Sequence, residues 1–328
     1  MNVSIVGCTG LVGRKMLEVL SEQNVKAEKV FLFASENSSG STVSVFGKSY
    51  PVSALNEKTV KQAENSIALF AVNKNLSQKF APLFIENGCV VIDNSSAFRM
   101  ERDVPLVVPN VNGEILTGNE KLIANPNCST IQAVSALKIL NDYRSIKRVS
   151  YVTFQAVSGA GQEGVRDLEK GKNNISPKKF PRPIFSNCIP QVDEFDFKGY
   201  TYEENKMIDE TKKILGLDKL SVTATCVRVP VFNCHSECVN VEFFTEYDVD
   251  TAVSLLKSAK GVKVFDGNDY PTVYDADGSD QVMIGRIRRD YSAPNALTFW
   301  CVADNLRVGA ATNAVEILKL VLWLKQKN

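Results

Sequence analysis

One cysteine in this sequence has a setting suited to nucleophilic chemistry. Cys128 follows Asn125-Pro126-Asn127 and precedes Ser129-Thr130, so it opens a predicted helix directly after a turn. Amide hydrogens and the positive end of the helix dipole stabilise a thiolate at such a position. A thiolate there can attack an acyl carbon or an aldehyde, and a hydride transfer can follow. We therefore predict Cys128 as a nucleophile; an inert buried thiol is the alternative, and is the interpretation for most of the other cysteines.

His235 is the single histidine of the chain, which excludes any multi-histidine metal site. It is therefore the one imidazole that can act as an acid/base partner for Cys128. A zinc site made of Cys234, His235 and Cys238 is disfavoured because the chain has no Cys-x-x-Cys pair and adjacent strand residues point to opposite faces. Arg228 lies seven residues before His235, so one regular strand would also separate these two, unless Pro230 breaks it.

A glycine-rich loop near the start could hold a dinucleotide. Gly7-Cys8-Thr9-Gly10-Leu11-Val12-Gly13 connects a predicted strand, 3–6, to a predicted helix, 10–22. Glycines at these positions allow a tight turn and a close approach of the backbone to a pyrophosphate, and the helix N-terminus adds amide hydrogens. The spacing is one residue longer than the commonest fingerprint. A purely structural turn is the alternative.

Glu36 follows the second predicted strand, 23 residues after Gly13. An acid at this position hydrogen-bonds a ribose diol and repels a 2′-phosphate, which favours NAD over NADP. A solvated loop acid beside a polar stretch, 37–41, is the alternative. Both interpretations stay open.

Composition excludes several function classes. The chain has 328 residues, is 44% hydrophobic and 23% charged, and carries 38 Lys and Arg against 37 Asp and Glu. A net charge of +1 gives no long-range attraction to nucleic acid or to an anionic membrane. Eight scattered cysteines, with neither a secretory leader nor a membrane-length apolar run, lead us to expect a cytoplasmic protein without disulfides.

The hydrophobic pattern predicts a fold of α/β class in two parts. In the first part short strands alternate with helices, which favours a parallel sheet. After residue 142 the strands become longer and alternate, which favours a mixed or antiparallel sheet. The expected strands are 3–6, 30–34, 67–71, 90–92, 121–124, 148–156, 220–229, 237–245 and 296–303, and the expected helices are 10–22, 76–86, 129–140 and 308–327. Residues 173–183, rich in proline and basic residues, are expected as an exposed loop.

Several motifs in order resemble the bacterial aspartate-semialdehyde dehydrogenase family nearly from end to end. Besides the glycine loop, they are Asp93-Asn94-Ser95-Ser96-Ala97-Phe98-Arg99, Pro109-Asn110-Val111-Asn112, Asn125-Pro126-Asn127-Cys128-Ser129-Thr130, Gln155-Ala156-Val157-Ser158-Gly159-Ala160-Gly161, Ile189-Pro190-Gln191, the segment from Arg228 to Ser236, Val282-Met283-Ile284-Gly285-Arg286-Ile287-Arg288 and Asp304-Asn305-Leu306-Arg307-Val308-Gly309-Ala310-Ala311. Such a series is more specific than any single motif.

The resemblance implies a Rossmann-type dinucleotide-binding domain, residues 1–127 with 309–328, and an α+β catalytic and dimerisation domain with a mixed sheet, residues 128–308. The implied reaction converts L-aspartate 4-semialdehyde, phosphate and NADP into L-aspartyl 4-phosphate and NADPH through a cysteine thioester. It belongs to the biosynthesis of lysine, threonine, methionine and isoleucine. The implied assembly is a homodimer or homotetramer whose partners are a small-molecule substrate and phosphate, with no metal.

Carried onto matching positions, the resemblance implies three catalytic residues: Cys128 as nucleophile, His235 as acid/base and Gln155 as the group that orients the acyl intermediate. It implies that Arg99, Asn127 and Lys206 hold phosphate, that Arg228 pairs with the α-carboxylate and that Glu203 pairs with the α-amino group. Glu203 and Lys206 are three residues apart in a predicted helix and therefore share a face. The implied cofactor-binding residues are Gly7, Thr9, Gly10, Leu11, Val12, Gly13, Ser35, Glu36, Ser38, Ser158, Gly159 and Asn305.

Two departures from the family pattern bear on the cofactor. The chain has Ala71-Val72-Asn73-Lys74 where many relatives have Ser-Ala-Gly-Gly, and Glu36 where NADP-using relatives often have arginine. NAD therefore stays an alternative to NADP, although Ser35 and Ser38 can donate to a 2′-phosphate. The alternative functions are a related acyl-phosphate reductase, such as one for N-acetyl-glutamyl phosphate, and a non-catalytic nucleotide-binding paralogue. An acetylated amine would offer Glu203 no cation, which argues for the free amino acid.

Overall fold

The structure is a computed structural model that describes residues 1–173 and 175–327. The chain divides into two compact units. One contains Met1–Pro126 and the segment that begins at Ala310, and the other is the continuous stretch Asn127–Gly309. Within the described residues, none of the helices combines the length and apolar character that a bilayer crossing requires.

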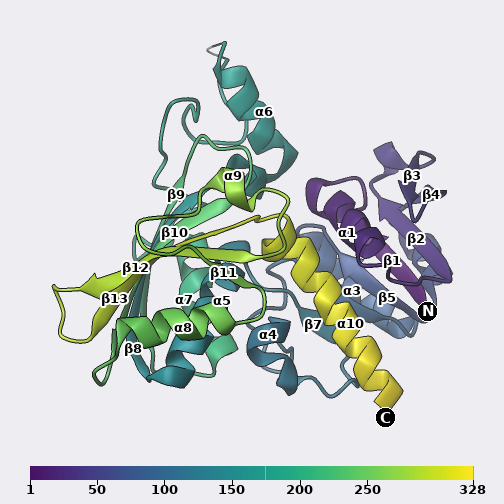
Figure 1. Ribbon diagram of the computed structural model, residues 1–328. Helices are drawn as coiled ribbons and strands as arrows, with labels where there is room; N and C mark the ends of the chain where they lie inside the picture. The colour runs from purple at the N-terminus through teal and green to yellow at the C-terminus, as the bar shows by residue number, and fades with distance from the viewer. Residues whose placement is uncertain (174, 328) are drawn as a thin grey trace. The chain divides into compact units, whose positions relative to one another are not determined.

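The first unit is built on a seven-stranded sheet with the order β3-β4-β2-β1-β5-β6-β7 (Figure 1). Its neighbouring strands are parallel, except in the antiparallel hairpin of β3 and β4. All five residues of β5 are buried, as is typical of a parallel strand covered on both faces. The strands are β1 (Asn2–Val6), β2 (Lys29–Ala34), β3 (Thr42–Val45), β4 (Lys48–Ala54), β5 (Ser66–Phe70), β6 (Val90–Asp93) and β7 (Leu122–Ala124).

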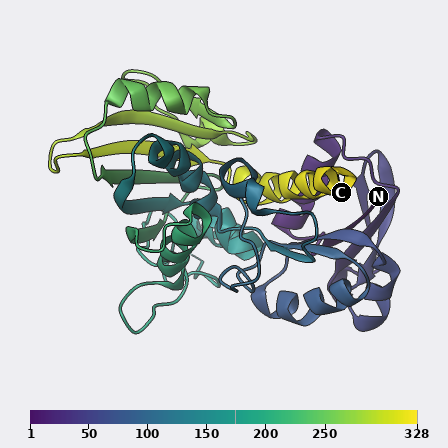
Figure 2. The same cartoon turned by 90° about the horizontal axis from the view of Figure 1, so that it is seen from below.

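Helices cover both faces of this sheet (Figure 2). Ile5 belongs to a core that includes residues of α1 (Leu11–Glu22) and α10 (Thr312–Lys327). Its neighbour Val6 belongs to a second core that includes residues of α3 (Lys74–Glu86). Successive residues of a strand point to opposite faces, so β1 has one core on each side. Shorter helical segments are η1 (Glu36–Ser38), α2 (Glu57–Val60), η2 (Lys61–Ala63), α4 (Pro109–Asn112) and η3 (Gly113–Ile115).

The strand order reverses at β1, which has β2 on one side and β5 on the other. In open α/β sheets ligands bind at such a switch point, outside the carboxyl ends of the strands. The loop that follows β1 begins at Gly7, and the loop that follows β5 begins at Ala71. These two loops therefore border the expected ligand crevice.

The second unit is built on a six-stranded mixed sheet with the order β11-β12-β13-β10-β8-β9 (Figure 1). The outer pairs β11–β12 and β8–β9 are parallel, and the three central pairs are antiparallel. The strands are β8 (Ile146–Gln155), β9 (Ser221–Arg228), β10 (His235–Phe243), β11 (Val262–Val264), β12 (Val282–Asp290) and β13 (Ala296–Ala303).

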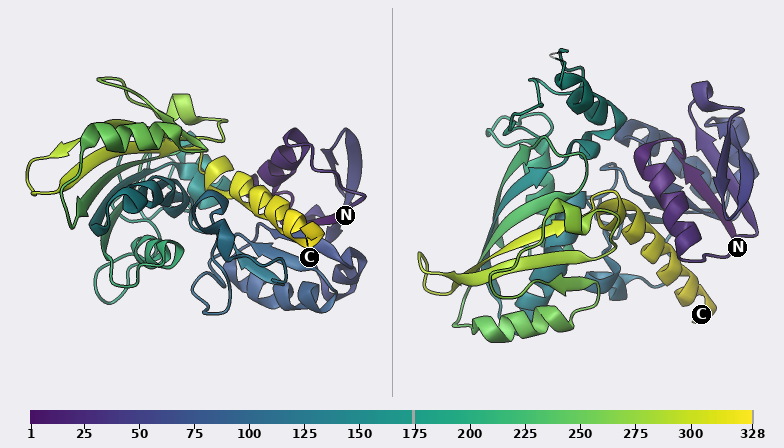
Figure 3. Two further views of the ribbon diagram at one scale, coloured as in Figure 1. Left: turned by 60° about the horizontal axis from the view of Figure 1, so that its bottom comes forward. Right: turned by 45° about the horizontal axis from the view of Figure 1, so that its top comes forward.

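Three helices pack together beside this sheet (Figure 3). α5 (Cys128–Tyr143) contacts α7 (Tyr202–Leu215), α8 (Val249–Ser258) and the strands β8, β10 and β13. Most of α5 is buried, including both Ser129 and Thr130 of its first turn. The remaining helical segments are η4 (Val157–Ala160), α6 (Gly161–Gly171), α9 (Val273–Ala276) and the π-helical turn η5 (Arg307–Ala311).

The predicted α/β class, with a parallel and a mixed sheet, is confirmed. The β3–β4 hairpin was not predicted, because its exposed faces carry serine, threonine and lysine in place of a clear apolar alternation. The predicted helix 308–327 begins as an α-helix only at Thr312, after the π-helical turn. Residues 175–183 lack regular structure and are mostly exposed, as expected. Asn174 of that loop and Asn328 of the predicted first domain lie outside the described residues.

Candidate active site

Cys128 is the first residue of α5, where the preceding residue caps the helix. The Asn127 side chain accepts hydrogen bonds from the amides of Ser129 and Thr130, at 3.0 and 3.2 Å. This bond pattern explains the turn before the helix, since asparagine is a strong N-cap. Cys128 is half-buried, and a Cβ atom on Gly309 would lie 2.7 Å from the Cys128 Cβ, so only glycine fits beside the nucleophile.

Three strands bring Arg228, Gln155 and His235 to one face of the mixed sheet. Arg228 ends β9 and pairs with Gln155 at the end of β8. Glu237, two residues after His235 on β10, pairs with Thr153, two residues before Gln155. Paired residues share a face, as do residues two apart on one strand. His235 and Gln155 therefore project from the same face as Arg228.

The structure decides between one regular strand and a break between Arg228 and His235: the strand is broken. They do not share a strand: β9 ends at Arg228, β10 begins at His235, and β8 lies between these two strands. The connection passes through Cys234, whose φ of 69° lies in the left-handed region, just before β10. The count of seven residues therefore does not set their relative faces. A Cβ atom on Gly159 would lie 2.9 Å from Arg228 Nη1 and 3.2 Å from His235 Nε2, so both side chains reach this glycine.

His235 is fully buried and neutral. Burial, reinforced by the positive charge of Arg228, lowers the pKa of His235 to about 3. The backbone amide of Ala156 donates to Nδ1 at 3.0 Å, so Nδ1 is an acceptor and the neutral ring carries its proton on Nε2. Nε2 is buried and has no hydrogen-bond partner in the described part of the chain. The Nε2–H group of His235 is therefore a hydrogen-bond donor that is available to a ligand.

Arg228 is buried beside this histidine. Its Nη1 donates to the carbonyl oxygen of Ala156 at 2.6 Å, and its guanidinium lies over the ring of Phe180. Burial lowers the pKa of Arg228, while the negative charges of Glu203 and Cys128 oppose that shift. A planar guanidinium fixed in this way suits bidentate recognition of a carboxylate.

Glu203 joins several predicted site residues. Its Oε1 accepts from Asn127 Nδ2 at 2.8 Å and from Gln155 Nε2 at 3.3 Å, and its Oε2 lies 3.3 Å from Lys206 Nζ. Thr201 caps α7, which places Glu203 in its first turn and Lys206 on the same face. Lys206 also forms an ion pair with Asp193 at 2.8 Å. The carboxylate therefore connects the N-cap of the nucleophile's helix to Gln155.

The predicted cofactor residues of the second unit also meet. Ser158 Oγ hydrogen-bonds Asn305 at 3.0 Å, and it donates to Asn233 at 3.2 Å. Asn305 Oδ1 accepts from the amide of Cys234 at 2.9 Å. This network fixes the turn that delivers His235 to the site. Gly159 follows Ser158 directly.

The glycine loop of the first unit has the geometry of a pyrophosphate cradle. Gly7 has a φ of 90°, and a Cβ atom there would overlap the carbonyl oxygen of Ala71. A Cβ atom on Gly13 would overlap the carbonyl oxygen of Gly7. Gly10 is the N-cap of α1 and supplies no side-chain bond to the first turn, which leaves amides there for a ligand. These residues fit a dinucleotide.

The other cofactor and substrate candidates of the first unit lie after β2 and β6. Glu36 and Ser38 are the first and last residues of the turn η1, and Ser35 is its N-cap; Ser35 and Glu36 are exposed and Ser38 is half-buried. In the described chain the Glu36 carboxylate has no ion pair that would neutralise its charge. Arg99 is buried, and its Nη2 donates to the carbonyl oxygen of Asn94 at 2.8 Å. Thr9, Leu11 and Val12 lie in the glycine loop and the first turn of α1.

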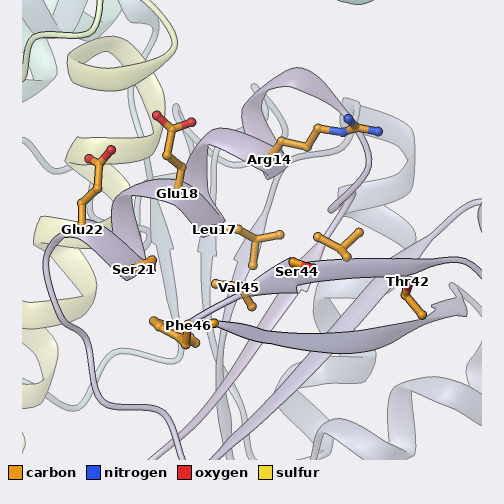
Figure 4. Close-up of a pocket in the computed structure, with 11 residues that line it drawn as sticks. Arg14, Leu17, Glu18, Ser21, Glu22, Thr42, Ser44, Val45 and Phe46 are labelled. Atoms are coloured by element: carbon orange, nitrogen blue, oxygen red, sulfur yellow. The ribbon is translucent and has the colours of Figure 1, made fainter.

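A groove of about 620 Å³ in the first unit contains none of the predicted site residues. It lies between α1 and the β3–β4 hairpin, and Arg14, Leu17, Val45 and Phe46 are among its lining residues (Figure 4). The groove is therefore a feature separate from the predicted site residues.

Sequence reasoning missed three contributors. Ala156 contacts both Arg228 and His235 through its backbone, which residue type cannot reveal. Glu210 accepts from the Asn127 amide at 2.6 Å. Its position seven residues after Glu203, on one helix face, was a usable signal. Glu237 is buried on β10, two residues after His235.

Cys234, His235 and Cys238, the zinc ligands argued against from the sequence, are not the group that the structure brings together. Among the described residues the potential metal-binding group is Cys234, Asp277 and Asp304, without His235 or Cys238. The Asp304 oxygens already accept backbone hydrogen bonds from Gly278 and Leu306. This cluster is therefore explained by turn formation.

Comparisons with known proteins agree with the two-unit fold. The family model described as semialdehyde dehydrogenase, NAD binding domain, matches residues 2–118, and the semialdehyde dehydrogenase dimerisation domain matches residues 137–308. The aspartate-semialdehyde dehydrogenase of Aquifex aeolicus (strain VF5) is 48% identical and covers 98% of this chain and 97% of its own. This chain belongs to the aspartate-semialdehyde dehydrogenase family. The family's NAD binding domain, residues 2–118, therefore lies within the first unit.

Solved structures of the family give the same result. Aspartate semialdehyde dehydrogenase II of Vibrio cholerae, complexed with ASA, superposes with a TM-score of 0.93 at 45% identity, over 98% of each chain. The enzyme of Candida albicans, solved with NADP, superposes with a TM-score of 0.76 at 25% identity, over 99% of each chain. The resemblance found in the motifs is therefore confirmed.

Proposed function

We propose that this chain catalyses the reversible phosphorylating oxidation of L-aspartate 4-semialdehyde, in which the aldehyde, phosphate and NADP give L-aspartyl 4-phosphate and NADPH. One observation carries the proposal: the capping residue of the nucleophile's helix, Asn127, is linked through Glu203 to Gln155. The residue before the nucleophile, an acyl-orienting amide and an amine-binding carboxylate are therefore parts of one hydrogen-bonded group. Family membership supports the same substrate.

In this proposal the Cys128 thiolate attacks the aldehyde carbon, and the carbonyl π electrons move to oxygen as the carbon–sulfur bond forms. His235 donates from Nε2 to that oxygen, since Nδ1 already accepts from Ala156. This is a hydrogen bond that stabilises the negative charge on the oxygen, and the neutral imidazole keeps its proton on Nε2. The nicotinamide cofactor, when bound, supplies the hydride acceptor for the oxidation. Gln155 then orients the thioester carbonyl, and a phosphate oxygen attacks it and displaces the sulfur of Cys128.

Substrate selection follows from two charges of opposite sign. Arg228 binds the α-carboxylate, and Glu203 binds the α-ammonium group. An N-acetylated substrate has no ammonium group, and Glu203 is buried, so its charge would be left without that partner. This argues against an N-acetyl-glutamyl-phosphate reductase. We assign the phosphate to Arg99, Asn127 and Lys206.

The cofactor assignment rests on the glycine loop and the turn after β2. Gly7, Thr9, Gly10, Leu11, Val12 and Gly13 would hold the pyrophosphate. The cofactor-binding residues that we propose in the second unit are Ser158, Gly159 and Asn305. We propose NADP as the cofactor, with Ser35 and Ser38 as donors to the 2′-phosphate. Glu36 weakens that preference, because its exposed carboxylate repels a second anion. Within the family pattern we also propose residues 1–127 with 309–328 as the dinucleotide-binding domain, residues 128–308 as the catalytic and dimerisation domain, and a cytoplasmic homodimer or homotetramer.

The test is cofactor reduction by the purified protein with L-aspartate 4-semialdehyde and phosphate, measured with NADP and with NAD. We expect reduction that depends on phosphate and that is lost in Cys128→Ala. A wild-type protein with no reduction under either cofactor would overturn the enzyme proposal and favour a non-catalytic paralogue. Cys128→Ala activity equal to wild type would overturn only the nucleophile assignment.

Glu36→Arg tests the cofactor argument separately. Removing one negative charge and adding a positive one should shift the ratio of kcat/KM for NADP over NAD upward by about tenfold or more. Glu57→Arg, which changes charge on the same unit at the start of α2, is the matched control and should leave the ratio unchanged. An unchanged ratio in Glu36→Arg would mean that Glu36 is a solvated bystander.

A further inference from the structure

A second row of side chains lies directly behind Arg228, Gln155 and His235. It consists of Cys226, Thr153, Glu237 and Cys301, one from each of β9, β8, β10 and β13, paired in register. Cys226, Thr153 and Glu237 each lie two positions from the site residue on the same strand. Cys301 pairs with Glu237. The row therefore projects from the same face of the sheet as the site. It is fully buried.

Glu237 is the member of this row that packing alone does not explain. Its side chain is completely buried, and across the described residues neither carboxyl oxygen has a hydrogen-bond partner. The buried hydroxyls of Ser129 and Thr130, in the first turn of α5, likewise lack a partner in that part of the chain. Of these two hydroxyls, that of Ser129 lies close enough to Glu237 to act on its carboxyl group.

The protonation state of Glu237 follows from its surroundings. Burial raises the pKa of Glu237 well above its ordinary range, the Ser129 hydroxyl opposes this shift, and the negative charge of Glu203 adds to it. A buried carboxylate without a cation is costly, so the group keeps its proton. A neutral carboxyl group has one O–H donor, and the Ser129 hydroxyl is an acceptor.

We propose that Glu237 is a positioning residue for the nucleophile: in the working enzyme its carboxyl O–H donates to Ser129 Oγ, which pairs two otherwise unpaired buried groups and holds the first turn of α5 against the sheet. Ser129 is the residue after Cys128, so this bond limits the movement of the sulfur relative to Gln155 and His235. A neutral donor also keeps a second negative charge away from the thiolate. The inference rests on the proposed role of Cys128.

The relation between stability and kcat distinguishes the positioning role from a purely structural one. Replacing a buried polar group by an apolar side chain of similar size is often neutral or stabilising. Glu237→Leu should therefore unfold at the same or a higher denaturant concentration than wild type while its kcat falls. A residue kept only for packing would show a kcat that follows stability.

Four variants test the bond: Glu237→Gln, Glu237→Leu, Ser129→Ala and the double variant Glu237→Leu with Ser129→Ala. Glutamine retains a donor without charge, so we expect its kcat within about threefold of wild type. Leucine and Ser129→Ala should each lower kcat about tenfold or more, with KM little changed, because a small displacement of a reacting group is costly. The double variant should be no slower than the slower single variant, since both remove one bond.

A second readout does not depend on dehydrogenase activity. Peptide mass spectrometry measures the rate at which iodoacetamide alkylates Cys128 at a series of pH values. Glu237→Leu and Ser129→Ala should give a pH profile of this rate that differs from wild type, and Glu237→Gln should give the wild-type profile. If wild type reduces no cofactor, this rate still reports the positioning of Cys128. Failure of the proposed function can therefore be distinguished from failure of the inference about Glu237. Cys301→Ala removes a side chain of the same row and is the control; it should lower stability without altering kcat or the alkylation profile.

Three results would overturn the inference. The first is Glu237→Gln as slow as Glu237→Leu, which would mean that the carboxylate form is required. The second is additive losses in the double variant, which would separate the two residues. The third is wild-type kcat and alkylation in Glu237→Leu. If Glu237→Leu does not fold, Ser129→Ala and Glu237→Gln still decide between these results, because the inference requires the first to be impaired and the second to be active.

Discussion

Arg228 and His235 are held by the same residue, Ala156, which accepts from the guanidinium through its carbonyl oxygen and donates to the imidazole through its amide. The distances are 2.6 and 3.0 Å. A change at Arg228 therefore reaches the imidazole through the backbone that joins them. If Arg228 binds the substrate carboxylate as proposed, that binding and the placement of the Nε2 donor are coupled.

Arg228→Lys tests this coupling. Lysine loses both the planar fork and the fixed bond to Ala156, so we expect KM for the semialdehyde to rise and kcat to fall together. A combined loss in kcat/KM of about a hundredfold corresponds to about 3 kcal/mol. Steady-state kinetics measure it. Arg166→Lys, at an exposed position of α6, is the control, and a change in KM alone would argue against the link to His235.

His235 predicts a dependence of stability on pH. Its pKa is about 3 in the folded protein and about 6.5 when unfolded, so between these values the unfolded chain binds more protons. The contribution is fully present above pH 6.5 and decreases as pH falls, by about 2 kcal/mol at pH 5. Urea unfolding at pH 7.5 and pH 5 should show a smaller loss in His235→Gln than in wild type. Equal losses in the two proteins would contradict a buried neutral imidazole.

Glu237 predicts the opposite trend with pH. Its pKa is raised in the folded protein, so above the ordinary value of 4.5 the folded state binds more protons and stability decreases as pH rises. Glu237→Gln removes this dependence, and its advantage over wild type in free energy of unfolding should grow from pH 5 to pH 8. Denaturant titrations at several pH values measure it. A constant difference between the two proteins would mean that Glu237 titrates normally.

Two adjacent glutamates of α7 separate binding from folding. Glu203→Gln removes the charge proposed to bind the substrate ammonium group, so KM should rise about tenfold or more. Glu204 instead accepts from the amides of Thr201 and Cys226, at 2.7 and 2.9 Å. Glu204→Gln should therefore lower stability and leave KM unchanged. Kinetics and unfolding on both variants check the pair, and exchanged phenotypes would refute the assignment.

Glycine positions in the first loop differ in how much space they have. Gly13→Ala would overlap the Gly7 carbonyl, whereas at Gly10 the nearest atom is 3.4 Å from an added Cβ and φ is −76°. We expect Gly13→Ala to lower cofactor affinity and thermal stability, and Gly10→Ala to fold like wild type. Fluorescence titration with NADP and thermal unfolding measure the two effects. Wild-type stability in Gly13→Ala would show that the loop relaxes without cost.

Local patterns predicted much of this fold and part of the site. The strand, glycine loop and helix of residues 2–22 are contiguous, so their periodicity is visible in the sequence. The start of α5 at Cys128 followed from the Asn125-Pro126-Asn127 turn directly before it. The alignment of Arg228 with His235 could not be predicted from spacing, because it depends on β8 lying between their strands. Glu237 was missed for the same reason, since its burial results from register with β8 and β13.

The path of the chain through its two units has a consequence for synthesis on the ribosome. Val315, Ile317 and Leu318 of α10 belong to the same core as Val3 and Ile5 of β1. A nascent chain that has just left β7 has therefore made every strand of the first sheet but lacks one of the helices that cover it. The second unit, Asn127–Gly309, is continuous and can be completed earlier. The apolar face under α10 thus stays uncovered while the rest of the chain is made, which exposes it to chaperones and to other nascent chains.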